Sequence, residues 1–112
     1  MELKELQAEI GNWAVRKGWS FTEDEIPEKL MLVTTELAEA MEDFRVDNHG
    51  MAWNEYRRDN SNKPYGFGIE LADAVIRLLH LADDLEIDMA AMVEIKMAYN
   101  EKREHRHGGK RA

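Results

Sequence analysis

The segment from Ile69 to Ala82 is apolar at nearly every position, and its polar exceptions recur at the spacing of a helix. These exceptions are Glu70, Asp73, Arg77 and His80. Residues three or four apart leave a helix on the same face, so the four side chains form one polar stripe. Burying charge in such a helix costs free energy unless the charge is paired or bound to a metal. The segment therefore predicts a packed helix that carries either ion pairs or a metal site.

A second carboxylate pair, Glu36 and Glu39, has the same three-residue spacing as Glu70 and Asp73. If the two pairs converge, their oxygens form the ligand set that Mg²⁺, Mn²⁺ or Ca²⁺ prefers. A divalent cation site built from these four residues is our leading hypothesis. The alternatives are that the first pair lies on an ordinary acidic surface and that Asp73 pairs with Arg77, four residues on.

Apolar periodicity predicts four helices and no strands in a single all-α domain, residues 1–112. The helices are expected at about residues 3–17, 27–45, 67–84 and 88–104. Pro27 suits the first turn of the second helix. The apolar stripe of that helix comprises Leu30, Val33, Leu37, Ala40, Met41 and Phe44. Asp43 lies beside this stripe, on the same side as Glu36 and Glu39.

Residues 47–68 have no helical periodicity and are rich in Asn, Gly and Pro, which are typical of turns. Trp53, Tyr56, Tyr65 and Phe67 add aromatic rings to this segment. A long loop with such rings is typical of a lid over a ligand, and packing against a neighbouring helix or subunit explains it as well.

The third predicted helix has more apolar surface than four short helices can cover. Once Ile69, Ala72, Ile76 and Leu79 are assigned to an internal core, Leu71, Val75, Leu78 and Ala82 are left over. We therefore expect an obligate oligomer.

The fourth predicted helix places Lys96, Asn100 and Arg103 on one face. Together with a carboxylate cluster, these donors suit a polyphosphate, because Mg²⁺ bridges carboxylates to phosphate oxygens and cations neutralise the remaining charge. The alternative is a solvated face near a helix end, where cations are also favoured. His80 is expected to be packed or hydrogen-bonded rather than a ligand, and no zinc-type spacing is present.

Composition and motifs exclude several other functions. The net charge of -8 opposes nonspecific binding to nucleic acid or anionic lipid, and the chain has no cysteine for thiolate chemistry or disulfides. No phosphate-binding glycine loop or nucleophile elbow is found, which leaves metal-assisted hydrolysis. No apolar run approaches the ~18 residues of a membrane span, and the first residues lack a signal-peptide core, so we expect a soluble cytoplasmic protein.

Several segments together resemble the MazG-like nucleoside triphosphate pyrophosphohydrolases. They are the two carboxylate pairs, residues 63–69 before the third helix, and the closing residues 96–103 and 107–110. The resemblance extends from about Trp13 to Lys110. It implies an all-α module of four to five helices in which two subunits complete a four-helix bundle, as a homodimer or homotetramer.

The resemblance also implies an activity and a site. The reaction is Mg²⁺-dependent hydrolysis of an NTP or dNTP between its α and β phosphates, which gives a monophosphate and pyrophosphate for nucleotide-pool cleansing or control. By motif position, Glu36, Glu39, Glu70 and Asp73 bind Mg²⁺, or Mn²⁺ in its place, Glu36 or Glu39 acts as general base, and Lys96, Asn100 and Arg103 contact the triphosphate. Many family members carry a glutamate where this chain has Thr35, so the general base stays open between Glu36, Glu39 and water activated by the metal alone.

Two further questions stay open at the level of sequence. Trp13, Trp53 and Tyr65 are candidates for stacking on the base, and equally for packing. The second hypothesis for function is a non-catalytic helical interaction module whose basic tail, from Lys102 to Arg111, touches nucleic acid.

Overall fold

The computed structural model describes residues 1–19 and 21–103 and is mainly helical, as predicted. Its α-helices are α1 (Leu3–Arg16), α2 (Ile26–Arg45), α3 (Phe67–Asp84) and α4 (Met89–Glu101). Two short 3₁₀ helices, η1 (Glu23–Glu25) and η2 (Asp47–Gly50), and two strands, β1 (Arg57–Arg58) and β2 (Pro64–Tyr65), connect them. Within these described residues, no helix is long and apolar enough to cross a membrane.

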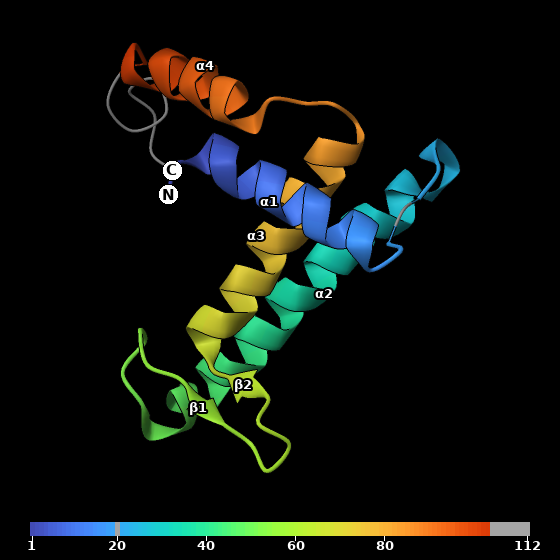
Figure 1. Ribbon diagram of the computed structural model, residues 1–112. Coiled ribbons are helices and arrows are strands. Elements are labelled where there is room, and N and C mark those ends of the chain that lie inside the picture. The colour runs from blue at the N-terminus through green and yellow to red at the C-terminus, as the bar shows by residue number, and fades with distance from the viewer. Residues whose placement is uncertain (20, 104–112) are drawn as a thin grey trace.

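Helices α2 and α3 run side by side in opposite directions and form the centre of the molecule (Figure 1). Their buried residues include Val33 and Ala40 from α2 and Ala74 and Leu79 from α3. Small residues at such positions let two helix backbones approach closely, which brings side chains at the edge of the interface together as well. This pair therefore positions every acidic residue of interest.

Helix α1 crosses the last turns of α3. At the crossing, a Cβ added to Gly11 would collide with the carboxylate of Asp83, so any larger residue would require the Asp83 side chain to move. Ile10 and Ala14 are buried on the same face of α1. Because α1 covers this end of α3, Ala82 is buried there, whereas the sequence assigned it to an uncovered surface.

The ends of α1 and α3 show how the sequence stops each helix. Gly18 has φ +73°, and the Trp19 amide donates to the carbonyl of Ala14, 2.8 Å away, as expected for a helix that ends in a left-handed glycine. Helix α3 ends in the same way with Glu86 at φ 58° and the Ile87 amide donating to the carbonyl of Ala82. Each turn sends the chain away from its helix axis.

The prediction that the chain has no strands is wrong for residues 57–65. Arg57 pairs with Tyr65 and Arg58 with Pro64 in a short antiparallel hairpin. Strands of two residues are too short to show alternation in a sequence. Asp59 closes the hairpin turn by accepting hydrogen bonds from Ser61 and Lys63, and the Ser61 hydroxyl contributes most to lowering the pKa of Asp59.

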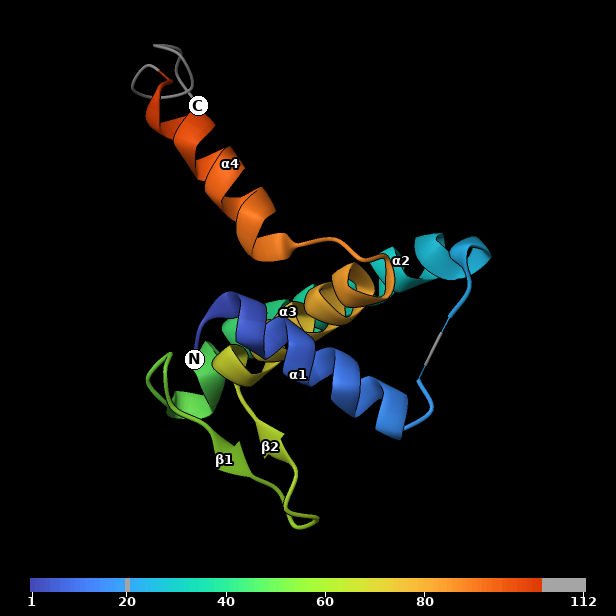
Figure 2. The same cartoon turned by 45° about the horizontal axis from the view of Figure 1, so that its top comes forward.

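Helix α4 projects from the rest of the molecule (Figure 2). Among the described helices, its main contact is with α1. Asp88 caps its first turn by accepting from the Ala91 amide. The buried side chain of Gln7 holds the approach to α4, because its Nε2 donates to the carbonyl of Ile87 and its Oε1 accepts from the Met89 amide. None of the residues of α4 is buried. Residues 104–112, which include most of the predicted basic tail and the end of the predicted fourth helix, lie outside the described residues.

Much apolar surface remains uncovered in a single chain. Leu30, Leu37, Met41 and Phe44 of the predicted α2 stripe are about half exposed, as are Leu71, Val75 and Leu78 of α3. In contrast, Val33 and Ala40 are buried as predicted. Trp53 of the connecting loop packs between the rings of Phe44 and Phe67, which agrees with the packing alternative, and about half of it is exposed.

Candidate metal site

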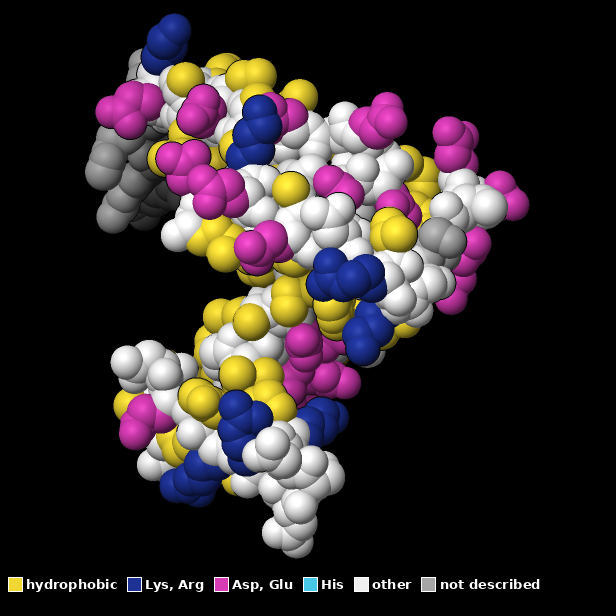
Figure 3. All heavy atoms as spheres, in the orientation of Figure 1, with side chains coloured by type: hydrophobic (Ala, Val, Ile, Leu, Met, Phe, Trp, Pro, Cys, Tyr) yellow, Lys and Arg dark blue, Asp and Glu magenta, His cyan; other side chains and the backbone are white. Residues whose placement is uncertain are grey.

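Three carboxylates converge where α2 faces α3. Glu36 from α2 and Glu70 and Asp73 from α3 each offer an oxygen, and the three oxygens lie within 4.8 Å of one another. The acidic side chains form a visible group beside the α2–α3 pair, with Lys and Arg side chains on both sides of it (Figure 3). The structure thus brings together three of the four residues that the sequence predicted as metal ligands.

Glu36 is also half of an ion pair between the two helices. It is 7 % exposed, and its Oε1 accepts a hydrogen bond from Nε of Arg77 at 2.9 Å. The sequence offered Asp73 as the partner of Arg77, but the guanidinium instead pairs with the more buried carboxylate across the helix interface. Pairing is more important for Glu36 because its burial removes more of the water that would stabilise its charge.

Glu70 is the most perturbed acid of the cluster. Its Oε2 is buried and has no hydrogen-bond partner among the described residues. Burial, a hydrogen bond with Glu39 and the charges of Glu39, Asp73 and Asp43 raise the pKa of Glu70 to about 7. A cation would satisfy the unpartnered oxygen and offset the crowding of negative charge, and oxygen donors are what Mg²⁺ and Mn²⁺ take. The residues present therefore fit a hard divalent cation.

Glu39 and Asp43 complete the acidic wall on α2. Glu39 is exposed and lies outside the group of three converging oxygens, although it adjoins Glu70. Asp43 lies one turn further along α2, and its charge also acts on Glu70. The sequence placed Asp43 on this side of α2 but assigned it no role.

The three predicted phosphate-binding residues do not reach the carboxylates within one chain. Lys96, Asn100 and Arg103 lie on the exposed face of α4 or just beyond its end, and α4 packs against α1 rather than against the acidic part of the α2–α3 pair (Figure 2). Lys96 and Arg103 both approach the ring of Tyr99, with Nζ at 4.9 Å and Cζ at 5.9 Å from its centroid.

A cavity of about 310 Å³ adjoins the carboxylate cluster through Arg77. Its lining comprises Trp19, Phe21, Lys29, Arg77, His80 and Leu81. The Nζ of Lys29 lies 5.5 Å from the centroid of the Phe21 ring, and His80 meets the same ring edge to face. His80 is packed, as expected, and its Nε2 lies 3.7 Å from the Asp84 carboxylate without a hydrogen bond.

Sequence reasoning missed this cavity because its residues come from three separate segments, none with a recognisable spacing. None of the aromatic residues proposed for base stacking lines this cavity. Trp13 packs edge-on against Trp19 at 4.6 Å, and Tyr65 packs edge-on against His49. The sequence feature that could have indicated this cavity is the pair of aromatic residues Trp19 and Phe21 in a short connection between helices.

The metal-free protein should lose stability as the pH rises toward and through about 7, because Glu70 must then ionise in a crowded site. The pKa of Glu70 is about 7 in the folded chain, against an ordinary value of 4.5. Between these values the folded state binds more protons than the unfolded state, so the Glu70 contribution to the free energy of unfolding falls as pH increases. Thermal melts in EDTA from about pH 5 to about pH 8 should show a weaker decline for Glu70→Gln than for the wild type. Parallel curves for the two proteins would contradict this account of Glu70.

No family model, curated protein or solved structure matches the chain in comparisons with known proteins.

Proposed function

We propose that this chain is a Mg²⁺-dependent nucleoside triphosphate pyrophosphohydrolase that cleaves between the α and β phosphates. The observation that carries the proposal is the convergence of Glu36, Glu70 and Asp73, with a buried and unpartnered oxygen on Glu70. Such a set suits chemistry on a substrate that brings its own negative charge and a bound cation. The products would be a nucleoside monophosphate and pyrophosphate.

Glu36, Glu39, Glu70 and Asp73 would hold the Mg²⁺, or Mn²⁺ in its place. When bound, the cation supplies Lewis-acid activation of water and of the scissile phosphate. Of the two candidate general bases, Glu39 is better suited to accept a proton from water, because it is exposed beside Glu70 while Glu36 is held by Arg77. Arg77 would keep Glu36 oriented toward the cluster.

The cavity beside Arg77 would receive the nucleobase. Its volume falls at the lower end of ordinary small-molecule sites, and Trp19 and Phe21 offer rings for stacking. Lys29 and His80 add polar groups at its wall. Because the cavity and the carboxylates share Arg77, a nucleotide would extend from the aromatic wall toward the acidic cluster.

The triphosphate contacts would come from a second copy of the chain. Lys96, Asn100 and Arg103 are exposed on a projecting helix, and the α2–α3 pair of each chain leaves half-exposed apolar side chains near its acidic cluster. In a homodimer, or a homotetramer of two dimers, α4 of one subunit would face the carboxylates of the other. The positive charges of Lys96 and Arg103 are opposite to those of the carboxylates and favour this arrangement.

This assembly makes a direct prediction about the protein in solution. Because the half-exposed side chains of α2 and α3 must be covered, sedimentation at micromolar concentration should give a dimer or tetramer. Met41→Lys would place a charge on the exposed stripe of α2 and should shift the protein toward monomer without unfolding it. A wild-type protein that sediments as a monodisperse monomer would contradict the prediction.

The proposed activity is tested by pyrophosphate release from a panel of NTPs and dNTPs with and without Mg²⁺. We expect release that requires the cation and differs among bases. No release from any nucleotide, at any Mg²⁺ concentration, would contradict the proposal.

A non-catalytic helical interaction module remains the second candidate, and the exposed apolar residues of α4 favour it. Ile95 and Met97 are 65 % and 64 % exposed, and Tyr99 is also exposed, which is typical of a surface that another molecule covers. This candidate leaves the unpartnered oxygen of Glu70 unexplained. It would be favoured if the nucleotide panel gave no turnover.

A further inference from the structure

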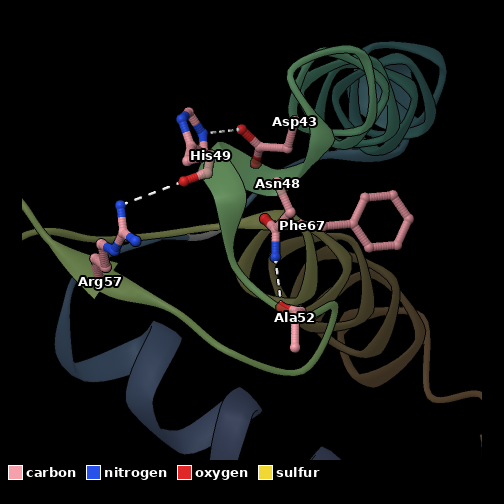
Figure 4. A network of polar contacts seen from close by, with 6 residues as sticks. All are labelled: Asp43, Asn48, His49, Ala52, Arg57 and Phe67. Atoms are coloured by element: carbon pink, nitrogen blue, oxygen red, sulfur yellow. Dashed lines mark hydrogen bonds and ion pairs between the residues drawn. The ribbon is translucent and has the colours of Figure 1, made fainter.

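The turn between α2 and the hairpin has an unusual backbone that is fixed by its side chains. Asp47, Asn48 and His49 have φ values of 52°, 49° and 57°, and none of them is glycine. Three consecutive left-handed residues cost conformational free energy, which the surrounding contacts must offset. The contacts of Asn48 and His49 lead in two directions, one to α3 and one to α2 (Figure 4).

Asn48 ties the turn to the start of α3. Its side chain is fully buried, its Nδ2 donates to the carbonyl of Ala52 at 2.7 Å, and its Oδ1 accepts from the amide of Phe67 at 2.8 Å. Phe67 is the first residue of α3, and Glu70 lies in the first turn of that helix. Asn48 therefore helps to fix the start of α3 and, with it, the position of Glu70.

His49 ties the same turn to the acidic wall of α2. Its Nε2 lies 2.8 Å from Oδ1 of Asp43, whose side chain is only 13 % exposed. The ring of Tyr65 packs edge-on against the imidazole. From the neighbouring strand, Nη1 of Arg57 donates to the carbonyl of His49 at 3.3 Å (Figure 4). The hairpin thus holds His49 from two sides.

Asp43 lies on the cluster side of α2 and is largely shielded from solvent, although it is outside the group of three converging oxygens. It follows Glu39 by one helical turn, and its charge is among those that raise the pKa of Glu70. The contact with His49 occupies Oδ1, and no hydrogen bond to Oδ2 is found among the described residues. One oxygen is therefore used to fix the side chain, while the described residues leave the other without a hydrogen bond.

We infer that His49 is a positioning residue that holds Asp43 as an additional carboxylate of the divalent cation site. The inference rests on the proposed function, since it concerns the same cluster. Groups that orient the acidic residues of a metal site without touching the metal contribute strongly to its affinity. This assignment gives the hairpin a role, which is to hold His49 in place.

The experiment measures Mn²⁺ binding by electron paramagnetic resonance, without nucleotide, so that turnover is not the readout. We expect His49→Ala to weaken binding at least about tenfold. His49→Gln should restore affinity to within about threefold of the wild type, because a side-chain amide can still donate to Asp43. Arg45→Ala is the matched control: it removes an exposed ion pair with Glu42 at the same end of α2 and should change nothing. Circular dichroism melts establish that each variant is folded.

A double-mutant cycle makes the test specific to the pair. If His49 acts through Asp43, Asp43→Asn and His49→Ala should each weaken Mn²⁺ binding, and the double variant should be little weaker than Asp43→Asn alone. Unchanged Mn²⁺ binding in His49→Ala would overturn the inference, because the imidazole would then have no effect on the site. Tighter binding would overturn it as well, because the imidazole would then act only through its charge. A wild type that fails to bind Mn²⁺ would overturn the proposed function together with this inference.

Discussion

Asp73→Asn should reduce Mg²⁺-dependent pyrophosphate release at least about a hundredfold while the helices stay folded. Asp73 contributes one of the three converging oxygens, and an amide binds a hard divalent cation less well than a carboxylate does. Glu39→Gln should have a comparable effect if Glu39 accepts the proton from water. Initial rates of pyrophosphate release over a range of Mg²⁺ concentrations measure both effects.

Stability separates this role from a structural one. Removing a charge from the crowded cluster relieves repulsion, so Asp73→Asn should melt no lower than the wild type in EDTA. Glu42→Gln provides the control, since Glu42 is an exposed acid on α2 whose partner is Arg45. A large loss of metal-free stability in Asp73→Asn, or full activity in both Asp73→Asn and Glu39→Gln, would overturn the assignment.

Two impaired variants should recover part of their activity when they share an oligomer. Arg103→Ala removes a charge-assisted phosphate contact and should lower kcat/KM by about ten- to a hundredfold, and Glu70→Gln should lower it at least as much. If α4 serves the site of the neighbouring subunit, a mixed dimer of these variants contains one site in which every residue is native. Random re-association of equal amounts would restore roughly a quarter of the wild-type sites.

The mixture also distinguishes the alternatives. If Arg103 served the site of its own chain, each site in the mixed dimer would lack one residue and no activity would return. Arg103→Lys keeps the charge without the planar fork of donors and should lose less activity than Arg103→Ala. If Lys96→Ala and Arg103→Ala both had wild-type kinetics, α4 would have no part in the site, whatever became of the metal ligands.

The sequence was most informative where a local pattern was strong. The bounds of α3 are those predicted, residues 67–84, because its apolar positions and its polar stripe both follow the helical period. The two carboxylate pairs were also visible, since three-residue spacing determines a shared helix face. Which acids would meet was not visible, because that depends on how α2 and α3 pack.

Features built from distant segments could not be predicted from the sequence. Arg77 pairs with Glu36, forty-one positions away, although Asp73 is its neighbour on the same helix. The cavity beside it draws on the connection before α2, on α2 and on α3. The position of α4 could not be predicted either. Its sequence shows which side chains could donate to a phosphate, but it does not show which helix those side chains face.

The side chain of Gln7 links the first helix to the start of the last. Its partners, Ile87 and Met89, lie eighty and eighty-two residues further along. During synthesis Gln7 therefore leaves the ribosome long before either group that it binds, and α1 cannot complete this contact until the start of α4 has emerged. A chain cut directly after α3 would lose both hydrogen bonds and open the Gln7 amide to water, and each such bond typically contributes about 0.5–1.5 kcal/mol. Removing α4 to obtain a smaller crystallisation target would thus weaken the packing of the first helix as well as delete the last.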